Sequence, residues 1–102
     1  EITHAIKDSK DVHGNPIHDG DVIGIAAGEL EVVSDSIEDA TMRVLEVLEA
    51  EDADTLTILA GEDYSDEAFE ALLSQIEGAY EDLEVDSHRG EQPLYPIILS
   101  VE

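Results

Sequence analysis

The spacing of apolar positions changes several times along the first third of the chain. Alternation in EITHAI, residues 2–6, predicts a strand with His4 on its apolar, partly buried face. Residues 10–21 are rich in Gly, Asn, Pro and Asp, which predicts a turn region. Two short apolar runs over residues 22–33 predict a hairpin that turns at Gly28, where a positive φ is allowed.

Two longer stretches carry apolar residues at helical spacing, each with a serine placed to cap it. The first helix is predicted over residues 34–54 with Ser36 as N-cap, and the second over residues 64–82 with Ser65 as N-cap. Their buried stripes are predicted to be Ile37, Ala40, Val44, Leu45 and Leu48 in the first helix, and Phe69, Leu72, Leu73, Ile76 and Tyr80 in the second.

Three more strands follow from the remaining pattern. Residues 55–61 are short and rich in β-branched side chains, residues 83–88 alternate and predict one solvated face, and residues 96–101 are nearly all apolar, as in a strand covered on both faces. The order of elements predicts one α/β domain over residues 1–102. We expect a two-layer or three-layer sandwich with a mixed sheet, two main helices and at least one right-handed βαβ unit.

The charge balance narrows the choice of partners. The chain has 27 Asp and Glu against four Lys and Arg, a formal net charge of −23. Nucleic acids and anionic membrane surfaces are therefore poor partners. A solvated acidic surface, a salt-adapted source and an electrostatic match to a basic partner all remain open. The absence of cysteine excludes disulfides, thiolate catalysis and cysteine-based zinc sites, and no apolar run reaches the ~20 residues of a membrane span.

The loop HRGEQPLYP before the last strand is the best candidate for a site. Arginine matches carboxylate and phosphate groups with a planar fork, and the two prolines fix the backbone. Three interpretations remain open: a rigid turn that delivers the last strand, a protein contact, and a site for a small acyl or phosphate ligand. The candidate contact residues are His88, Arg89, Gly90, Gln92, Pro93 and Tyr95.

A second cluster has residue types that can bind a metal. His13, His18, Asp19 and Asp21 could supply imidazole and carboxylate ligands. Their spacing matches no standard metal motif, and Asp, Asn and Gly are also the residues that turns use. We therefore predict no metal site and no catalytic residue in this chain. The chain begins at Glu1 without a methionine, which is expected of a domain cut from a longer protein.

Four stretches resemble one family, in order and over essentially all 102 residues. They are ITHAIKDS, GDVIGIAAGELEVVSDSIEDA, TLTILAGEDYSDEAFEAL and GEQPLYPIILSVE. These stretches are similar to the C-terminal domain of the fatty-acid kinase A proteins (FakA/YloV type), which are related to dihydroxyacetone kinase. The family usually has two glycines before the glutamine of the last loop, whereas this chain has Gly90 and then Glu91. A positive φ at the second of these positions would therefore fall on Glu91.

The resemblance implies a C-terminal fragment of a longer, cytoplasmic, multi-domain kinase. In such proteins the N-terminal domain holds ATP and Mg²⁺ and phosphorylates the acyl carboxylate that a separate DegV-type fatty-acid-binding protein presents. The resemblance therefore implies no cofactor here, and a role in docking the DegV-type protein or scaffolding other domains of the same chain, with a homodimer formed through the parent chain. The element order is also similar to the C-terminal subdomain of DegV-type proteins, although their Thr-Gly-Pro-Gly loop pattern is lacking.

Overall fold

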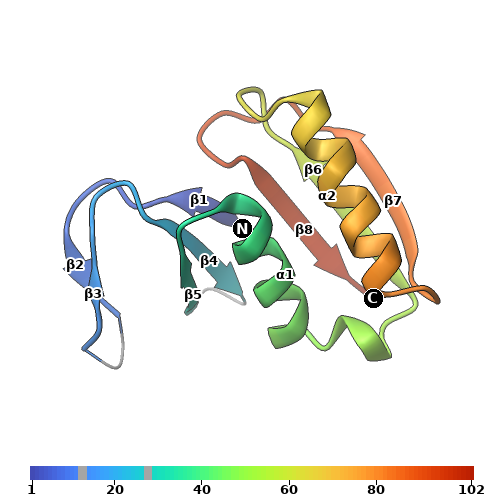
Figure 1. Ribbon diagram of the computed structural model, residues 1–102, viewed down its shortest axis with the longest axis horizontal. Helices are drawn as coiled ribbons and strands as arrows, with labels where there is room; N and C mark the ends of the chain where they lie inside the picture. Colours follow the sequence, from blue (N-terminus) through green and yellow to red (C-terminus); the bar gives the residue numbers. More distant parts are fainter. Residues whose placement is uncertain (12–13, 27–28) are drawn as a thin grey trace.

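A mixed six-stranded sheet is the centre of the computed structural model, which describes residues 1–11, 14–26 and 29–102. Its strands lie in the order β5-β4-β1-β8-β6-β7 (Figure 1). A small two-stranded ribbon, β2 with β3, projects from one side of the sheet. The bounds are β1 Ile2–His4, β2 Ser9–Lys10, β3 Pro16–Ile17, β4 Val22–Ala26, β5 Glu29–Ser34, β6 Thr55–Ala60, β7 Glu84–Arg89 and β8 Ile97–Val101.

The two α-helices begin at the predicted caps. α1 spans Ile37–Val47, and the Ser36 hydroxyl accepts a hydrogen bond from the amide of Asp39 at 3.0 Å. α2 spans Asp66–Ala79, and the Ser65 hydroxyl accepts one from the amide of Ala68 at 3.1 Å. Among the described residues, no helix is both long and apolar enough to cross a membrane.

The first helix ends earlier than predicted. It stops at Val47, Glu49 takes a φ of +57°, and a short 3₁₀ turn follows over Ala50–Asp52. The residues after Val47 are mostly acidic, and α1 has no basic residue in its last turn. Carboxylates are unfavourable at the negative end of a helix dipole, so continuation of the helix is disfavoured there.

Both helices pack on one face of the sheet, so the sandwich has two layers within the described part. Leu56, Ile58 and Ala60 of β6 are fully buried under the helices and share one core with both of them. The alternate residues of the same strand, such as Thr57, are exposed. We call this second side of the sheet the open face. The prediction that the last strand is covered on both faces was wrong, because Ser100 of β8 pairs with Thr57 and lies on the open face.

One βαβ unit sits at the β7 edge. β6 and β7 are parallel in register from Thr55 opposite Glu84 to Ala60 opposite Arg89, and α2 connects them. With α2 in front of the sheet, β7 lies to the right of β6 in Figure 1, which is the predicted right-handed crossover. Every other neighbouring pair of the large sheet is antiparallel within the described residues.

Two predictions about the first part of the chain were wrong. β1 ends at His4, whose side chain is exposed, and Ile6 is 87% exposed. The alternating pattern assigned both to a buried face, but the chain leaves the sheet after His4. The stretch predicted as a turn region contains β2 and β3, and Ile17 of β3 is buried. The hairpin of β4 and β5 is confirmed, while its turn residue Gly28 lies outside the described residues.

Candidate functional site

The segment between β7 and β8 folds over the carboxyl end of β6. The amide of Gly61 donates to the carbonyl of Pro96 at 2.8 Å, and the amide of Glu62 donates to the carbonyl of Gln92 at 3.1 Å. A Cβ at Gly61 would lie 2.4 Å from the carbonyl oxygen of Tyr95, so only glycine fits this approach. The loop from residue 90 to 96 is therefore seated on the start of the β6–α2 connection.

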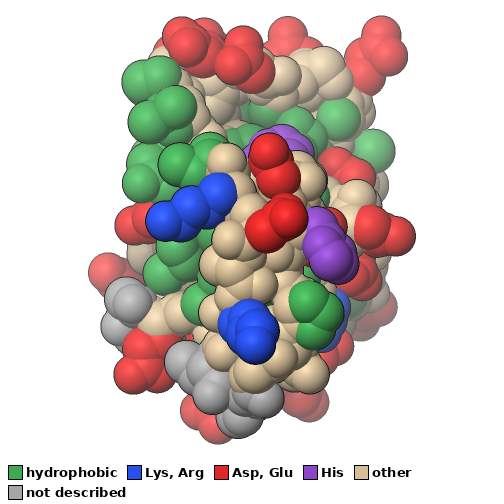
Figure 2. Space-filling model, turned by 90° about the vertical axis from the view of Figure 1, so that its left-hand side faces the viewer, with side chains coloured by type: hydrophobic (Ala, Val, Ile, Leu, Met, Phe, Trp, Pro, Cys, Tyr) green, Lys and Arg blue, Asp and Glu red, His purple; other side chains and the backbone are tan. Residues whose placement is uncertain are grey.

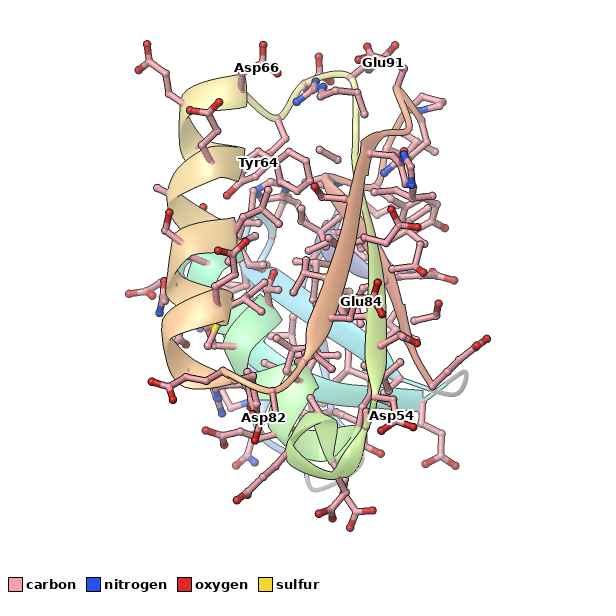
Figure 3. All side chains as sticks on the ribbon, turned by 90° about the vertical axis from the view of Figure 1, so that its right-hand side faces the viewer. Asp54, Tyr64, Asp66, Asp82, Glu84 and Glu91 are labelled. Carbon is pink, nitrogen blue, oxygen red and sulfur yellow. The ribbon has the colours of Figure 1, made fainter. Side chains whose placement is uncertain are left out.

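Arg89 joins this loop to the start of α2. Its Nη1 donates to the carbonyl of Tyr64 at 2.6 Å and its Nη2 to the carbonyl of Gly61 at 2.9 Å. Its Nε donates to the Glu91 carboxylate at 3.1 Å, and Asp66 lies 3.3 Å from Nη1. Figure 3 shows Asp66 and Glu91 at the same end of the molecule. Every guanidinium nitrogen thus has a partner within the chain, which gives Arg89 a bracing role.

Gln92 holds the loop from inside. Its Nε2 donates to the carbonyls of Leu59 at 3.2 Å and Tyr95 at 3.0 Å. Its Oε1 is buried and has no hydrogen-bond partner among the described residues. A Cβ at Gly90 would lie 2.2 Å from this oxygen, so the carboxamide packs directly against the Gly90 backbone. Gly90 therefore gives the carboxamide of Gln92 its place.

Two residues of the loop adopt left-handed backbone conformations that side chains disfavour. Glu91 has a φ of +56°, so the position where the related family usually has glycine does require a positive φ. Leu94 has a φ of +73°, and its side chain is 81% exposed. The hydroxyl of Thr3 donates to the Leu94 carbonyl at 3.0 Å, and the Tyr95 amide donates to the Pro93 carbonyl at 2.9 Å. The neighbouring strands therefore hold an exposed leucine in a strained backbone.

A cavity of about 190 Å³ opens beside Leu94. Its walls come from the end of β1, the start of α1, the β6–α2 connection and the β7–β8 loop. This is the carboxyl end of the parallel strands, where α/β sheets commonly bind ligands. The lining residues are His4, Ile37, Gly61, Asp63, Tyr64, Gln92, Leu94, Tyr95 and Pro96.

Tyr64 forms the buried wall of this cavity. Its hydroxyl donates to Oε2 of Glu38 at 2.5 Å, and its ring meets Phe69 edge to face with centroids 6.3 Å apart. Figure 3 shows Tyr64 between the start of α2 and the sheet. Burial, and then the hydrogen bond and negative charge of Glu38, raise the pKa of Tyr64 well above its usual value. The phenol therefore stays protonated at neutral pH and ties the β6–α2 connection to α1.

The structure separates the candidate residues that are adjacent in sequence. Gln92 and Tyr95 line the cavity, and Arg89 braces the loop behind it. His88 lies elsewhere: it pairs with Leu59 across β7 and β6, and its Nε2 is 2.9 Å from Oδ1 of Asp86. Gly90 and Pro93 are exposed and are not among the lining residues.

The other wall residues were not predicted as site residues. One signal for them was present, because Gly61, Asp63 and Tyr64 belong to GEDYSDE, the connection from a parallel strand to its helix. Residues His4 and Ile37 come from distant parts of the chain, and local sequence carries no sign of their approach. In the metal candidate, Oδ2 of Asp21 accepts from the amide of His18 at 2.9 Å, which is turn chemistry; His13 lies outside the described residues.

Comparison with known proteins gives the class to which this domain belongs. The fold and the matched sequences define the C-terminal part of a fatty acid kinase component. The chain belongs to the FakA-like C-terminal family of fatty acid kinases, which it matches over residues 1–102.

Two relatives show how much of a longer protein the match covers. Protein YloV of Bacillus subtilis (strain 168) is 36% identical over 102 residues, which is 100% of this chain and 18% of the relative. An uncharacterized protein of Staphylococcus haemolyticus (strain JCSC1435) is 34% identical over 101 residues, which is 99% of this chain and 18% of the relative. The chain thus spans about a fifth of the length of the relatives it matches.

Proposed function

We propose that this chain is a non-catalytic docking domain at the C-terminal end of a fatty-acid-kinase-type protein. In this proposal it binds the DegV-type fatty-acid-binding partner, or holds other domains of the same chain in place, while the N-terminal domain phosphorylates the bound acyl carboxylate with ATP and Mg²⁺. The family to which the chain belongs supports the kinase setting. The proposed contact surface is the cavity rim, formed by His4, Leu94 and Tyr95.

The observation that carries the proposal is the state of Leu94. A large apolar side chain that is 81% exposed gains little from folding, and its φ of +73° adds strain. Strained backbone of this kind persists where the surroundings fix it, and it is concentrated at sites that contact ligands or partners. An apolar side chain held rigidly beside a cavity is the form of an interface anchor, because its ordering cost is already met before binding.

The chemistry of the cavity wall supports a contact role over catalysis. Tyr64 is protonated and bonded to Glu38, and Gln92 braces the loop. The net charge of −23 supports a partner with a basic contact surface, because complementary fields speed association and suppress wrong partners. On the side seen in Figure 2, acidic side chains are spread widely over the surface and basic ones are few.

A small acyl or phosphate ligand at the Arg89–Tyr95 loop is the alternative function. The cavity holds about 190 Å³, below the roughly 300–1,000 Å³ of ordinary ligand pockets. The guanidinium of Arg89 is also bonded to the carbonyls of Tyr64 and Gly61. A phosphate would therefore have to compete with these internal acceptors, which favours the docking proposal.

The test is calorimetric titration of the chain with a purified DegV-type protein from the same source at two salt concentrations. We expect binding that weakens at the higher salt concentration and a loss of affinity of about tenfold or more for Leu94→Ala. Val47→Ala is the matched control, because Val47 is also an exposed aliphatic residue but lies on α1, 45% exposed. No heat with the wild-type chain, or equal affinity for both variants, would contradict docking through this rim.

A further inference from the structure

The large sheet is split at one end, between β4 and β8. β1 lies between these strands but pairs with β8 at one position only, Ile2 opposite Ile97, while β8 continues to Val101. Among the described residues, no strand pairs with β8 on this side beyond Ile97. Figure 1 shows the split as a V, with the first residue of the chain at its apex and α1 crossing it in front.

The split forms a groove of about 430 Å³ with apolar walls. Ile25 and Ala26 of β4 form one wall, residues 98–101 of β8 form the other, and Val44 and Leu48 of α1 form the floor. The groove therefore combines apolar side chains with a length of strand edge whose backbone groups lack a strand partner. An extended segment satisfies both, because it pairs with the edge and covers the floor.

We propose that the residues preceding Glu1 in the full-length protein continue β1 into this groove as an antiparallel strand between β4 and β8. This inference rests on the proposal that the chain is the C-terminal part of a longer protein, of which relatives show the remaining length. The register is already set at the mouth of the groove. The amide of Ile25 donates to the carbonyl of Glu1 at 2.8 Å, and the nitrogen of Glu1 donates to the carbonyl of Ile25 at 2.8 Å.

Continuing this register fixes the chemistry of the incoming residues. The residue before Glu1 falls opposite Ala26 and Leu99, on the face that α1 covers. Space on this face is limited, because a Cβ at neighbouring Gly24 would lie 2.5 Å from Cγ2 of Val44. We therefore expect a small or apolar residue immediately before Glu1, then one that tolerates water on the open face, because strand side chains alternate between faces.

The proposed strand would fix this domain to the segment that precedes it. A connection built into the middle of a sheet is held by hydrogen bonds on both sides, whereas a flexible linker leaves the domains free to rotate. Because the groove flanks residues 98–101 and the proposed docking rim lies before Ile97, the two surfaces occupy opposite ends of β8. The connection and the docking rim can therefore operate at the same time.

The direct test is amide hydrogen exchange in the full-length protein and in the 102-residue chain. We expect the β8 amides of residues 98–101 that point away from β6 to exchange at least about tenfold more slowly in the full-length protein. Equal exchange rates would overturn the proposal. Protection that grows with protein concentration would assign the groove to a second molecule and would also overturn it.

Extended variants give a second test on the 102-residue chain. An added Val-Thr-Val before Glu1 places apolar side chains over α1, and we expect its Tm to exceed that of the matched extension Thr-Val-Thr by at least about 4 °C. Equal Tm values would overturn the register. Either failure leaves titration with the DegV-type protein unchanged, so the strand proposal and the docking proposal can fail separately.

Discussion

At the scale of single residues, Tyr64 controls how the site responds to alkaline pH. Burial and Glu38 raise its pKa above the usual 10.0. Below about pH 10 both the folded and the unfolded chain keep the phenolic proton, so the free energy of unfolding does not depend on this group. Above about pH 10 the unfolded chain releases the proton while the folded chain keeps it. The unfolded state then binds fewer protons, and stability falls as the pH rises.

We therefore expect the urea midpoint of the wild-type chain to decrease above about pH 10, and Tyr64→Phe to remove part of that decrease. Near pH 8 the same variant loses the hydrogen bond to Glu38 and is expected to be less stable by about 1–3 kcal/mol. Tyr80→Phe serves as the comparison, because burial and the charges of Glu46 and Glu51 raise the pKa of Tyr80 too. Parallel curves for wild type and Tyr64→Phe above pH 10 would contradict this assignment.

At the scale of elements, the contact between the end of β6 and the β7–β8 loop depends on the absence of one side chain. A Cβ at Gly61 would meet three backbone atoms, the nearest being the carbonyl oxygen of Tyr95 at 2.4 Å. Backbone atoms on a braced loop cannot rotate away as a flexible side chain can. The loop, the cavity and the bracing by Arg89 therefore all depend on Gly61.

We expect Gly61→Ala to lower the free energy of unfolding by about 1–3 kcal/mol, as overpacking does in other tightly packed sites. Gly78→Ala is the matched control, because Gly78 lies within α2 and no heavy atom lies within 4 Å of a Cβ built there. That control is expected to gain about 0.5–1 kcal/mol from improved helix propensity. Equal urea midpoints for Gly61→Ala and wild type would contradict the close approach.

The sequence was sufficient to predict elements whose signals are local. Ser36 and Ser65 cap their helices as predicted, because capping depends on residues three positions apart. The buried stripe of α2 through Phe69, Leu72 and Ile76 also appears as its spacing indicates. The positive φ of Glu91 followed from comparison with the usual glycine of the family.

The parts that sequence reasoning missed depend on contacts between distant segments. The exposure of His4 depends on how far α1 reaches over the sheet, and the exposure of Ser100 depends on both helices choosing one face. The three partners of Arg89 on the β6–α2 connection, Gly61, Tyr64 and Asp66, lie at least 23 positions away in sequence. Such contacts leave no local pattern.

At the scale of the whole molecule, the net charge of −23 opposes the folded state through self-repulsion. We expect the Tm to rise when NaCl is increased from 0.1 M to 1 M, because the screening length falls from about 10 Å to about 3 Å. The double variant Glu70→Gln with Glu77→Gln, two exposed carboxylates on α2, is expected to show a smaller rise. A Tm that does not rise with salt would contradict this account of the charge.

The position of β8 has a consequence for the birth of the protein on the ribosome. β8 is made after every other strand of the large sheet, yet it lies between β1 and β6. The half with β1, β4, β5 and α1 and the half with β6, α2 and β7 are both synthesised before the strand that joins them. Synthesis proceeds from the N-terminus at about 5–20 residues per second, and pairing of distant segments slows folding. The two halves must therefore wait as separate, partly covered units, and the nascent chain closes its sheet only when β8 emerges.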